Sequence, residues 1–317
     1  MRFSKTVALG AAASLAKAQR PDNTSICDYY TTALLKNNTA ENQATLLTLV
    51  VNTVVIGNYT MPNVGITVPG ILAAGKYNGT DVNLLPYFTG DLASSNRGGS
   101  SGVAINFLDD GGAEPLKNNK PANTDSSNQY FLLTHLYQFF GSLLGCSEQG
   151  MPGYESYTGH ASMYEVHKFM DLDVYEVSYF ITQVGLAASS FGVADSDVAI
   201  VGSALQSLFG YRCSPPTTVI EAQGPELQAI CIADNCPVAT SAVCDSYATV
   251  SEPTSATSTM SMPSNGTYPT PTPTGSGSAT TTMGSSTMSA TSVPTAGAAV
   301  NGLGLAALAG GIAAFVL

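Results

Sequence analysis

Tryptophan is absent from this 317-residue chain, and charged residues are scarce. Asp, Glu, Lys and Arg make up 10% of the residues, and 11 basic residues face 22 acidic ones, for a formal net charge of −11. No basic patch breaks this acidic balance, so the composition argues against a nucleic-acid-binding protein. Histidine is rare too, and chemistry that needs an imidazole has only three candidate side chains.

The motifs of several enzyme classes are also missing. The chain has neither the His-Glu-x-x-His pair of metalloproteases nor a phosphate-binding loop. A retaining glycosidase would need two carboxylates converging in a cleft, usually with aromatic platforms for the sugar. No such pair stands out, because Asp109-Asp110 fits a loop, and Asp171 and Asp173 fit the start of a helix. The sequence therefore predicts none of these enzyme classes.

The first 18 residues have the features of a secretory signal peptide. Arg2 and Lys5 precede an apolar run, and Ala16-Lys17-Ala18 fits the small-x-small cleavage pattern. The run is too short to span a membrane. We expect residues 1–18 to be removed from the mature protein.

The other end of the chain carries a second predicted signal. Residues 247–297 are rich in Ser, Thr and Pro, which predicts an O-glycosylated stalk that cannot build a core. The apolar tail at 298–317 has no basic flank and matches a GPI-attachment signal that is removed. A true membrane helix is the weaker alternative, because the tail is short and rich in Gly and Ala. The expected location is the extracellular face of the plasma membrane, held by the GPI lipid, or the cell wall glucan, as in fungal surface proteins.

Glycosylation sequons and cysteines agree with secretion. The five Asn-x-Ser/Thr acceptors are Asn23, Asn37, Asn58, Asn78 and Asn265. The six cysteines are Cys27, Cys146, Cys213, Cys231, Cys236 and Cys244. An even count in an oxidising compartment predicts up to three disulfides and leaves the connectivity open. The absence of a Cys-x-x-Cys pair argues against structural zinc.

Between the terminal signals, residues 19–246 are expected to form one all-α domain. Helical periodicity is found over 26–35, 41–55, 127–145, the segment after Ser162, 173–191 and 195–208, and a short helix is expected at 225–233. The β-branched end of 41–55 would also fit a strand, but a helix is favoured. The Gly- and Asn-rich residues 57–123 predict a long irregular insertion, and residues 213–244 a disulfide-tied appendix.

One histidine lies in an informative setting. Ser162 and Glu165 have capping-box spacing, which predicts a short helix. Within it Met163, His167 and Met170 are spaced i, i+4 and i+7 and share one face. His167 is therefore either an ordinary core histidine or a ligand.

Several motifs follow one another around this helix. They are Phe139-Phe140-Gly141-Ser142-Leu143-Leu144-Gly145, then Pro152, Tyr154 and Tyr157-Thr158-Gly159, then Met163-Tyr164-Glu165-Val166-His167. In this order, and followed by two long helices, they resemble the group 1-like truncated globins. The resemblance covers Tyr130 to about Phe209, and it rests on the order and spacing of the motifs together.

The resemblance implies a globin-like helical fold with haem as cofactor. His167 matches the proximal iron ligand, and His135 stands at a distal position where some truncated globins carry a second histidine. Around them Leu132, Leu136, Phe139, Phe140, Met163 and Met170 would form the haem pocket. The implied role is redox chemistry, sensing or haem handling with a small diatomic or redox partner. The alternative is a cofactor-free surface or cell-wall protein that keeps the fold as a structural or interaction scaffold.

Overall fold

The computed structural model describes residues 19–256. The predicted signal peptide, the greater part of the predicted stalk, Asn265 and the predicted GPI signal lie outside these residues. None of the helices within 19–256 is long and apolar enough to cross a membrane.

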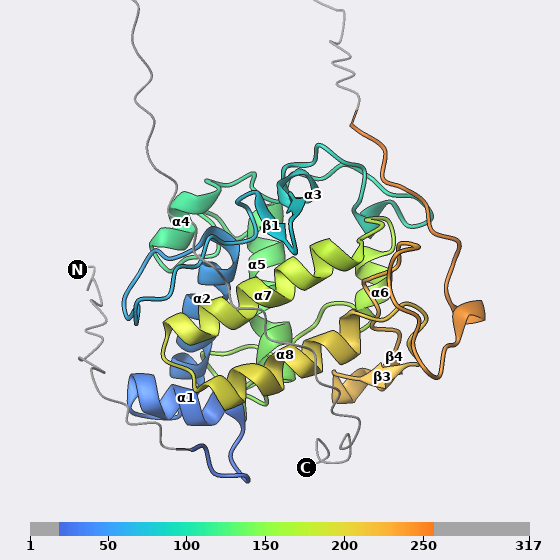
Figure 1. Cartoon of the computed structure of the whole chain (residues 1–317). Helices are drawn as coiled ribbons and strands as arrows, with labels where there is room; N and C mark the ends of the chain where they lie inside the picture. Colours follow the sequence, from blue (N-terminus) through green and yellow to red (C-terminus); the bar gives the residue numbers. More distant parts are fainter. Residues whose placement is uncertain (1–18, 257–317) are drawn as a thin grey trace, which may run out of the picture. The chain divides into compact units, whose positions relative to one another are not determined.

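The described part of the chain is rich in helix, as the sequence predicts, and it also has short strands that an all-α prediction does not include (Figure 1). The helices are α1 (Ile26–Leu35), α2 (Ala40–Ile56), α3 (Leu85–Thr89), α4 (Ala113–Lys117), α5 (Asn128–Leu143), α6 (Met163–His167), α7 (Val174–Ser190) and α8 (Asp195–Phe209). Two antiparallel pairs join β1 (Gly75–Tyr77) to β2 (Thr80–Val82) and β3 (Thr217–Thr218) to β4 (Pro225–Glu226). Three 3-10 turns are η1 (Asn96–Gly98), η2 (Glu221–Gln223) and η3 (Cys244–Ser246).

Capping residues stand at the starts of α5, α6 and α7. Ser127 Oγ accepts a hydrogen bond from Tyr130 N at the start of α5, and Asp173 and Glu176 form a complete capping box at the start of α7. At α6, Ser162 Oγ accepts from Glu165 N at 3.2 Å, as expected. The 41–55 segment is helical to its end, so its β-branched residues do not make a strand.

The long helices pack around one core. Figure 1 shows α7 and α8 side by side and running in opposite directions, and α2 contacts α1, α5 and α7. Each of four long helices contributes a leucine or valine that is almost fully buried: Leu47, Leu133, Val177 and Leu205. The apolar stripes predicted for these helices therefore meet in the interior.

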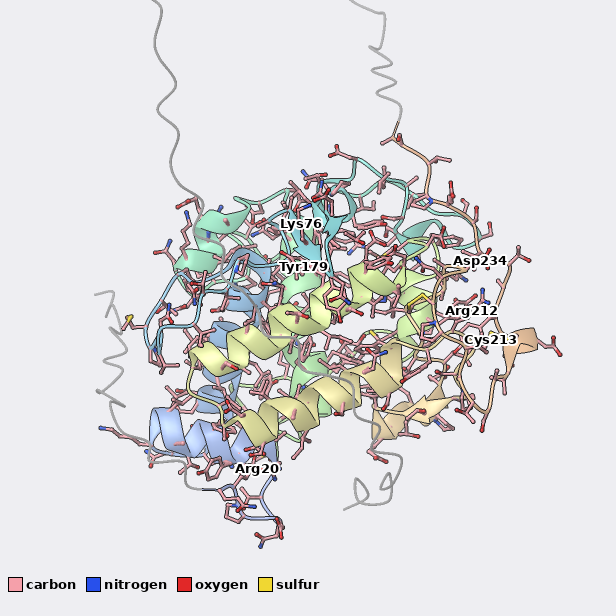
Figure 2. All side chains as sticks on the ribbon, in the orientation of Figure 1. Arg20, Lys76, Tyr179, Arg212, Cys213 and Asp234 are labelled. Carbon is pink, nitrogen blue, oxygen red and sulfur yellow. A yellow bond between two sulfur atoms is a disulfide. The ribbon has the colours of Figure 1, made fainter. Side chains whose placement is uncertain are left out.

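The insertion at 57–123 is irregular, as predicted, and buried polar side chains attach it to the helices. Gln183 of α7 accepts a hydrogen bond from Gly70 N at 3.0 Å, and Asn52 of α2 donates to the Leu116 carbonyl at 3.1 Å. Tyr179, labelled on α7 in Figure 2, donates to the carbonyls of Gly70 and Ala73. These bonds satisfy loop backbone groups that would otherwise be buried without partners.

The helix predicted over 225–233 is wrong. Pro225 and Glu226 instead form β4, and residues 228–232 after them are buried and belong to no helix. Their backbone N–H groups donate across the fold: Ile230 and Cys231 to the Phe209 carbonyl, and Ile232 to the Leu172 carbonyl. These tertiary hydrogen bonds replace the local ones that a helix would make, and a proline, which is common at helix starts, does not begin a helix here.

All six cysteines pair, and the prediction of three disulfides is confirmed. The pairs are Cys27–Cys146, Cys213–Cys244 and Cys231–Cys236. The last two tie residues 213–244 together beside the Arg212–Asp234 ion pair, whose N–O distance is 2.7 Å (Figure 2). Beyond this appendix the backbone of Ser255 forms a bridge with Leu92, so main-chain pairing continues past the predicted start of the stalk at 247.

Candidate functional site

A cavity of about 280 Å³ lies between the long helices and the insertion. Most of its lining side chains are apolar, and α2, α5, α6 and α7 together supply half of the lining residues. Native cores contain few voids larger than a water molecule, whereas ligand pockets enclose about 300–1,000 Å³. This cavity is close to that range and is the candidate ligand site.

The structure brings the predicted pocket residues together at this cavity. The six apolar side chains expected there all line it: Leu132, Leu136, Phe139, Phe140, Met163 and Met170. They come from one face of α5 and from α6 with the turn after it, which are separated by 19 residues in the chain (144–162). His167, the last residue of α6, lines the same cavity.

His167 is held in one orientation by its own helix. Its Nδ1 lies 2.7 Å from the carbonyl oxygen of Met163. A carbonyl oxygen can only accept, so Nδ1 carries the proton and Nε2 carries the lone pair of the neutral ring. No described residue hydrogen-bonds to Nε2. The lone pair therefore lies on the side of the ring away from the helix backbone, at the cavity wall.

Burial lowers the pKa of His167 from its ordinary value, and the hydrogen bond to Met163 opposes this only in part. The imidazole is thus neutral at pH 7, the form that binds a metal ion.

The lowered pKa of His167 predicts a pH dependence of stability. Between that pKa and 6.5 the unfolded chain binds a proton at this position that the folded protein does not, so stability falls as pH falls through this window. We expect wild type to lose up to about 1.4 kcal/mol per pH unit from this group, and His167→Phe to lose less. Urea unfolding of both proteins at pH 5.5 and 7.5 measures the difference.

The raised pKa values of Asp171 and Glu176 change stability in the opposite direction, since their folded forms hold a proton more tightly. Both groups are present in wild type and variant, so their effect cancels in the comparison. Equal pH slopes for the two proteins would contradict the assignment of a depressed pKa to His167.

His135 does not lie at the cavity. Its Nδ1 donates to the Phe131 carbonyl at 2.6 Å, and its ring packs against Phe131 and edge-on against Tyr157. His135 is not among the residues that line the cavity, whereas Leu136, the next residue of α5, does line it. The predicted pair of histidines across one pocket is therefore not formed in this structure.

Sequence reasoning missed the part of the cavity that the insertion supplies. Ser94, Ser95, Asn96 and Arg97 line it, and so does Phe107. Nothing in a Gly- and Ser-rich loop with no periodicity indicates which residues will reach a helical core. The only signal was a single arginine in an otherwise neutral stretch.

Glu176 is the one carboxylate among the described residues that line the cavity. Its Oε1 accepts from Tyr87 Oη at 3.1 Å, and its Oε2 accepts from Asp173 N at 3.0 Å. Burial raises the pKa of Glu176, and these two hydrogen bonds oppose the rise. Glu176 therefore caps α7 and anchors Tyr87, and it is not a free base.

Two other arrangements offer less. Acidic residues including Asp171, Asp173 and Asp234 line a second hollow, but within 19–256 no group of three or more His, Cys, Asp or Glu side chains is placed to hold a metal ion. A Gly-x-Ser-x-Gly string occurs at Gly98–Gly102, yet Ser100 is exposed in a bend. A nucleophile elbow needs a strand before the serine and a helix after it.

The predicted glycan acceptors within the described residues are accessible. Asn23, Asn37, Asn58 and Asn78 are all exposed. Asn58 also accepts a hydrogen bond from Val68 N at 2.6 Å through its Oδ1, which leaves its Nδ2 to carry a glycan. Their exposure agrees with the proposal below that the protein is secreted.

Comparisons with known proteins give no relative. The chain matches no protein-family model, no curated protein and no solved structure. Function must therefore be argued from the cavity and its residues.

Proposed function

We propose that the protein binds haem in this cavity, where Nε2 of His167 would bind the iron. The observation that carries the proposal is the hydrogen bond from Nδ1 of His167 to the Met163 carbonyl at the wall of an apolar cavity. Metal-binding histidines almost always donate their second ring N–H to a carbonyl or carboxylate, which fixes the tautomer and raises the basicity of the ligating nitrogen. The resemblance to truncated globins, with helices α5 to α8 in the expected order, adds support.

The size of the cavity sets a condition on this proposal. At about 280 Å³ it is small for a porphyrin, so side chains must move on binding. Met163 and Met170 both line it, and unbranched methionine side chains change rotamer readily. Arg97 lines the cavity and is exposed, so the cavity reaches the surface there and one edge of a ligand can extend into solvent. With these adjustments the residues fit a flat apolar ligand that has a polar edge.

Each residue has a definite task in this arrangement. Met163 holds the ring of His167 through its carbonyl, and Leu132, Leu136 and Phe139 exclude water from the face of the ligand. Bound haem would supply redox chemistry or small-molecule binding at its iron. Because His135 is turned away, we propose a single histidine ligand and a role in redox chemistry, sensing or haem handling.

The proposed place of action is the outer cell surface. Three disulfides within the described residues are compatible with an extracellular protein, because such bonds persist in oxidising compartments. Attachment through a GPI lipid, or to cell-wall glucan, remains part of the proposal and rests on the sequence alone.

A hemin titration tests the proposal. The full chain is expressed in a secretory host, and the visible spectrum of the secreted protein is recorded with increasing hemin. We expect a saturable Soret band in wild type and at least about 100-fold weaker hemin binding in His167→Ala. Mutation of residues that only hydrogen-bond to a metal ligand already lowers metal affinity by about 10–100-fold, and loss of the ligand itself should cost more.

His135→Ala is the matched control. Both histidines donate from Nδ1 to the carbonyl four residues earlier, but only His167 lines the cavity. His135→Ala should therefore leave hemin affinity and spectrum unchanged. If folded wild type fails to bind hemin, or if His167→Ala binds as well as wild type, the haem proposal is wrong. The protein would then be pursued as a cofactor-free surface scaffold.

A further inference from the structure

The cavity has a charged side chain at its opening that the haem proposal does not use. Arg97 of η1 lines the cavity, although its loop lies outside the stretch that resembles truncated globins. Ser94 and Ser95 beside it are buried, and together with Asn96 they form the most polar part of an otherwise apolar wall. The opening therefore has a chemical character different from the interior.

The loop that carries Arg97 is held firmly in place. Ser95 and Val103 exchange two backbone hydrogen bonds of 3.0 Å, and Ser95 Oγ accepts from Arg97 N. A Cβ atom on Gly102 would lie 2.1 Å from the Ala93 carbonyl oxygen, so only glycine allows the two sides of the loop to approach this closely. The position of Arg97 is thus fixed by the fold.

The guanidinium of Arg97 lies against aromatic rings of the cavity. Its Cζ atom is 4.3 Å from the centre of the Phe131 ring and 5.4 Å from that of Phe107, and both rings line the cavity. Stacking on aromatic faces is a common way to hold an arginine while its N–H groups stay free to bind an anion.

No carboxylate of the described residues forms an ion pair with Arg97. Its protein hydrogen-bond partner is the neutral amide oxygen of Asn128. Asp109 lies next in this network, but its carboxylate accepts from the backbone N–H groups of Asn128 and Gln129 at the start of α5. In a chain with net charge −11, a cation without an acidic partner at the opening of an apolar cavity points to an anionic ligand.

We propose that the cavity binds an amphipathic molecule that ends in a carboxylate, with the apolar body inside and the carboxylate held by Arg97. An arginine fork and a carboxylate form two parallel charge-assisted hydrogen bonds, which gives this contact its specificity. The same chemistry is presented by the propionate of a porphyrin and by the carboxylate of a fatty acid. The inference goes beyond the haem proposal, because it needs no iron and no contact with His167.

Paired acid and ester probes test this proposal. Binding of metal-free protoporphyrin IX and of its dimethyl ester is measured through the fluorescence of the porphyrin, and a fluorescent long-chain fatty acid is compared with its methyl ester. We expect wild type to prefer at least one acid over its ester by about ten-fold or more. Arg97→Met, which keeps an apolar stem against Phe131, should bind acid and ester equally, and Arg97→Lys should keep part of the preference.

Lys120→Met is the matched control. Lys120 is an exposed cation with no ion pair among residues 19–256, and it does not line the cavity, so its loss should not change the preference. Preference for the porphyrin acid identifies a propionate as the source, and preference for the fatty acid alone identifies an acyl chain. The proposal is overturned if wild type binds neither acid, binds acid and ester equally, or keeps its preference in Arg97→Met. His167→Ala should show the same preference for acid over ester as wild type. This result would support the role of Arg97 even if the protein did not bind haem through His167.

Discussion

Replacing Cys27 and Cys146 together by alanine is expected to lower the free energy of unfolding by about 5 kcal/mol. This disulfide joins α1 to the turn after α5, across 119 residues of sequence. The entropy that a cross-link removes from the unfolded chain grows with the logarithm of the loop it closes, so this bond has the largest effect of the three. It also fixes the end of α5, the helix that supplies four of the six predicted apolar pocket residues.

The matched control is the double variant Cys231→Ala/Cys236→Ala. These cysteines are also buried, but they are separated by only 5 residues, for which the same relation gives about 2 kcal/mol. Urea unfolding of wild type and both variants measures the two losses. Equal losses would show that chain entropy does not set the contribution of these disulfides.

Gly141→Ala is expected to destabilise the protein by about 3 kcal/mol, although alanine usually stabilises a helix interior by about 0.5–1 kcal/mol relative to glycine. A Cβ atom at this position of α5 would lie 1.8 Å from Tyr154 Oη and 2.8 Å from its Cζ. Tyr154 is buried and donates its hydroxyl to the Tyr137 carbonyl at 2.8 Å, so it cannot move away without losing that bond. The turn at 152–159 would be pushed off α5.

Gly202→Ala on α8 is the control for this second prediction. A Cβ there meets nothing within 4 Å, so this substitution should stabilise the protein slightly. The stability of Gly141→Ala and Gly202→Ala is measured by thermal unfolding. Wild type, Gly141→Ala, Tyr154→Phe and the double variant Gly141→Ala/Tyr154→Phe also form a double-mutant cycle. Removal of Tyr154 Oη should relieve part of the clash. Additive losses in the double variant would contradict the close approach of these two residues.

The long helices could be predicted because their signals are local. The predicted segment 26–35 coincides with α1, and Ser127, Ser162 and Asp173 start helices where their capping chemistry places them. When the capping residue, the stop signal and the apolar stripe of a segment all indicate the same helix, the helix can be predicted without knowledge of distant contacts.

The errors arise where distant contacts decide the conformation. Residues 230–233 do not form a helix, because the carbonyls of Phe209 and Leu172 accept their N–H groups, and no local sequence pattern identifies such distant partners. The disulfide connectivity is set by the fold in the same way. His135 has the residue type of a ligand, but its ring packs against Phe131 and Tyr157 and does not line the cavity.

The helical part of the cavity lining could be predicted from the sequence, and the loop part could not. Six apolar side chains and His167 were placed there from helical spacing and family resemblance, and the structure brings them together. Arg97 and its serine neighbours could not be predicted to line the cavity. Their loop is positioned by the close approach of Gly102 to Ala93 and by the backbone hydrogen bonds between Ser95 and Val103, and not by a periodic sequence pattern.

The most direct test of haem binding is a crystal structure of the secreted protein with hemin. We predict an iron–nitrogen bond to Nε2 of His167, with Nδ1 still donating to the Met163 carbonyl and His135 still packed against Tyr157. The propionate edge should lie toward Arg97. Iron bound to any other side chain, or hemin found only on the surface beside an empty cavity, would contradict the account.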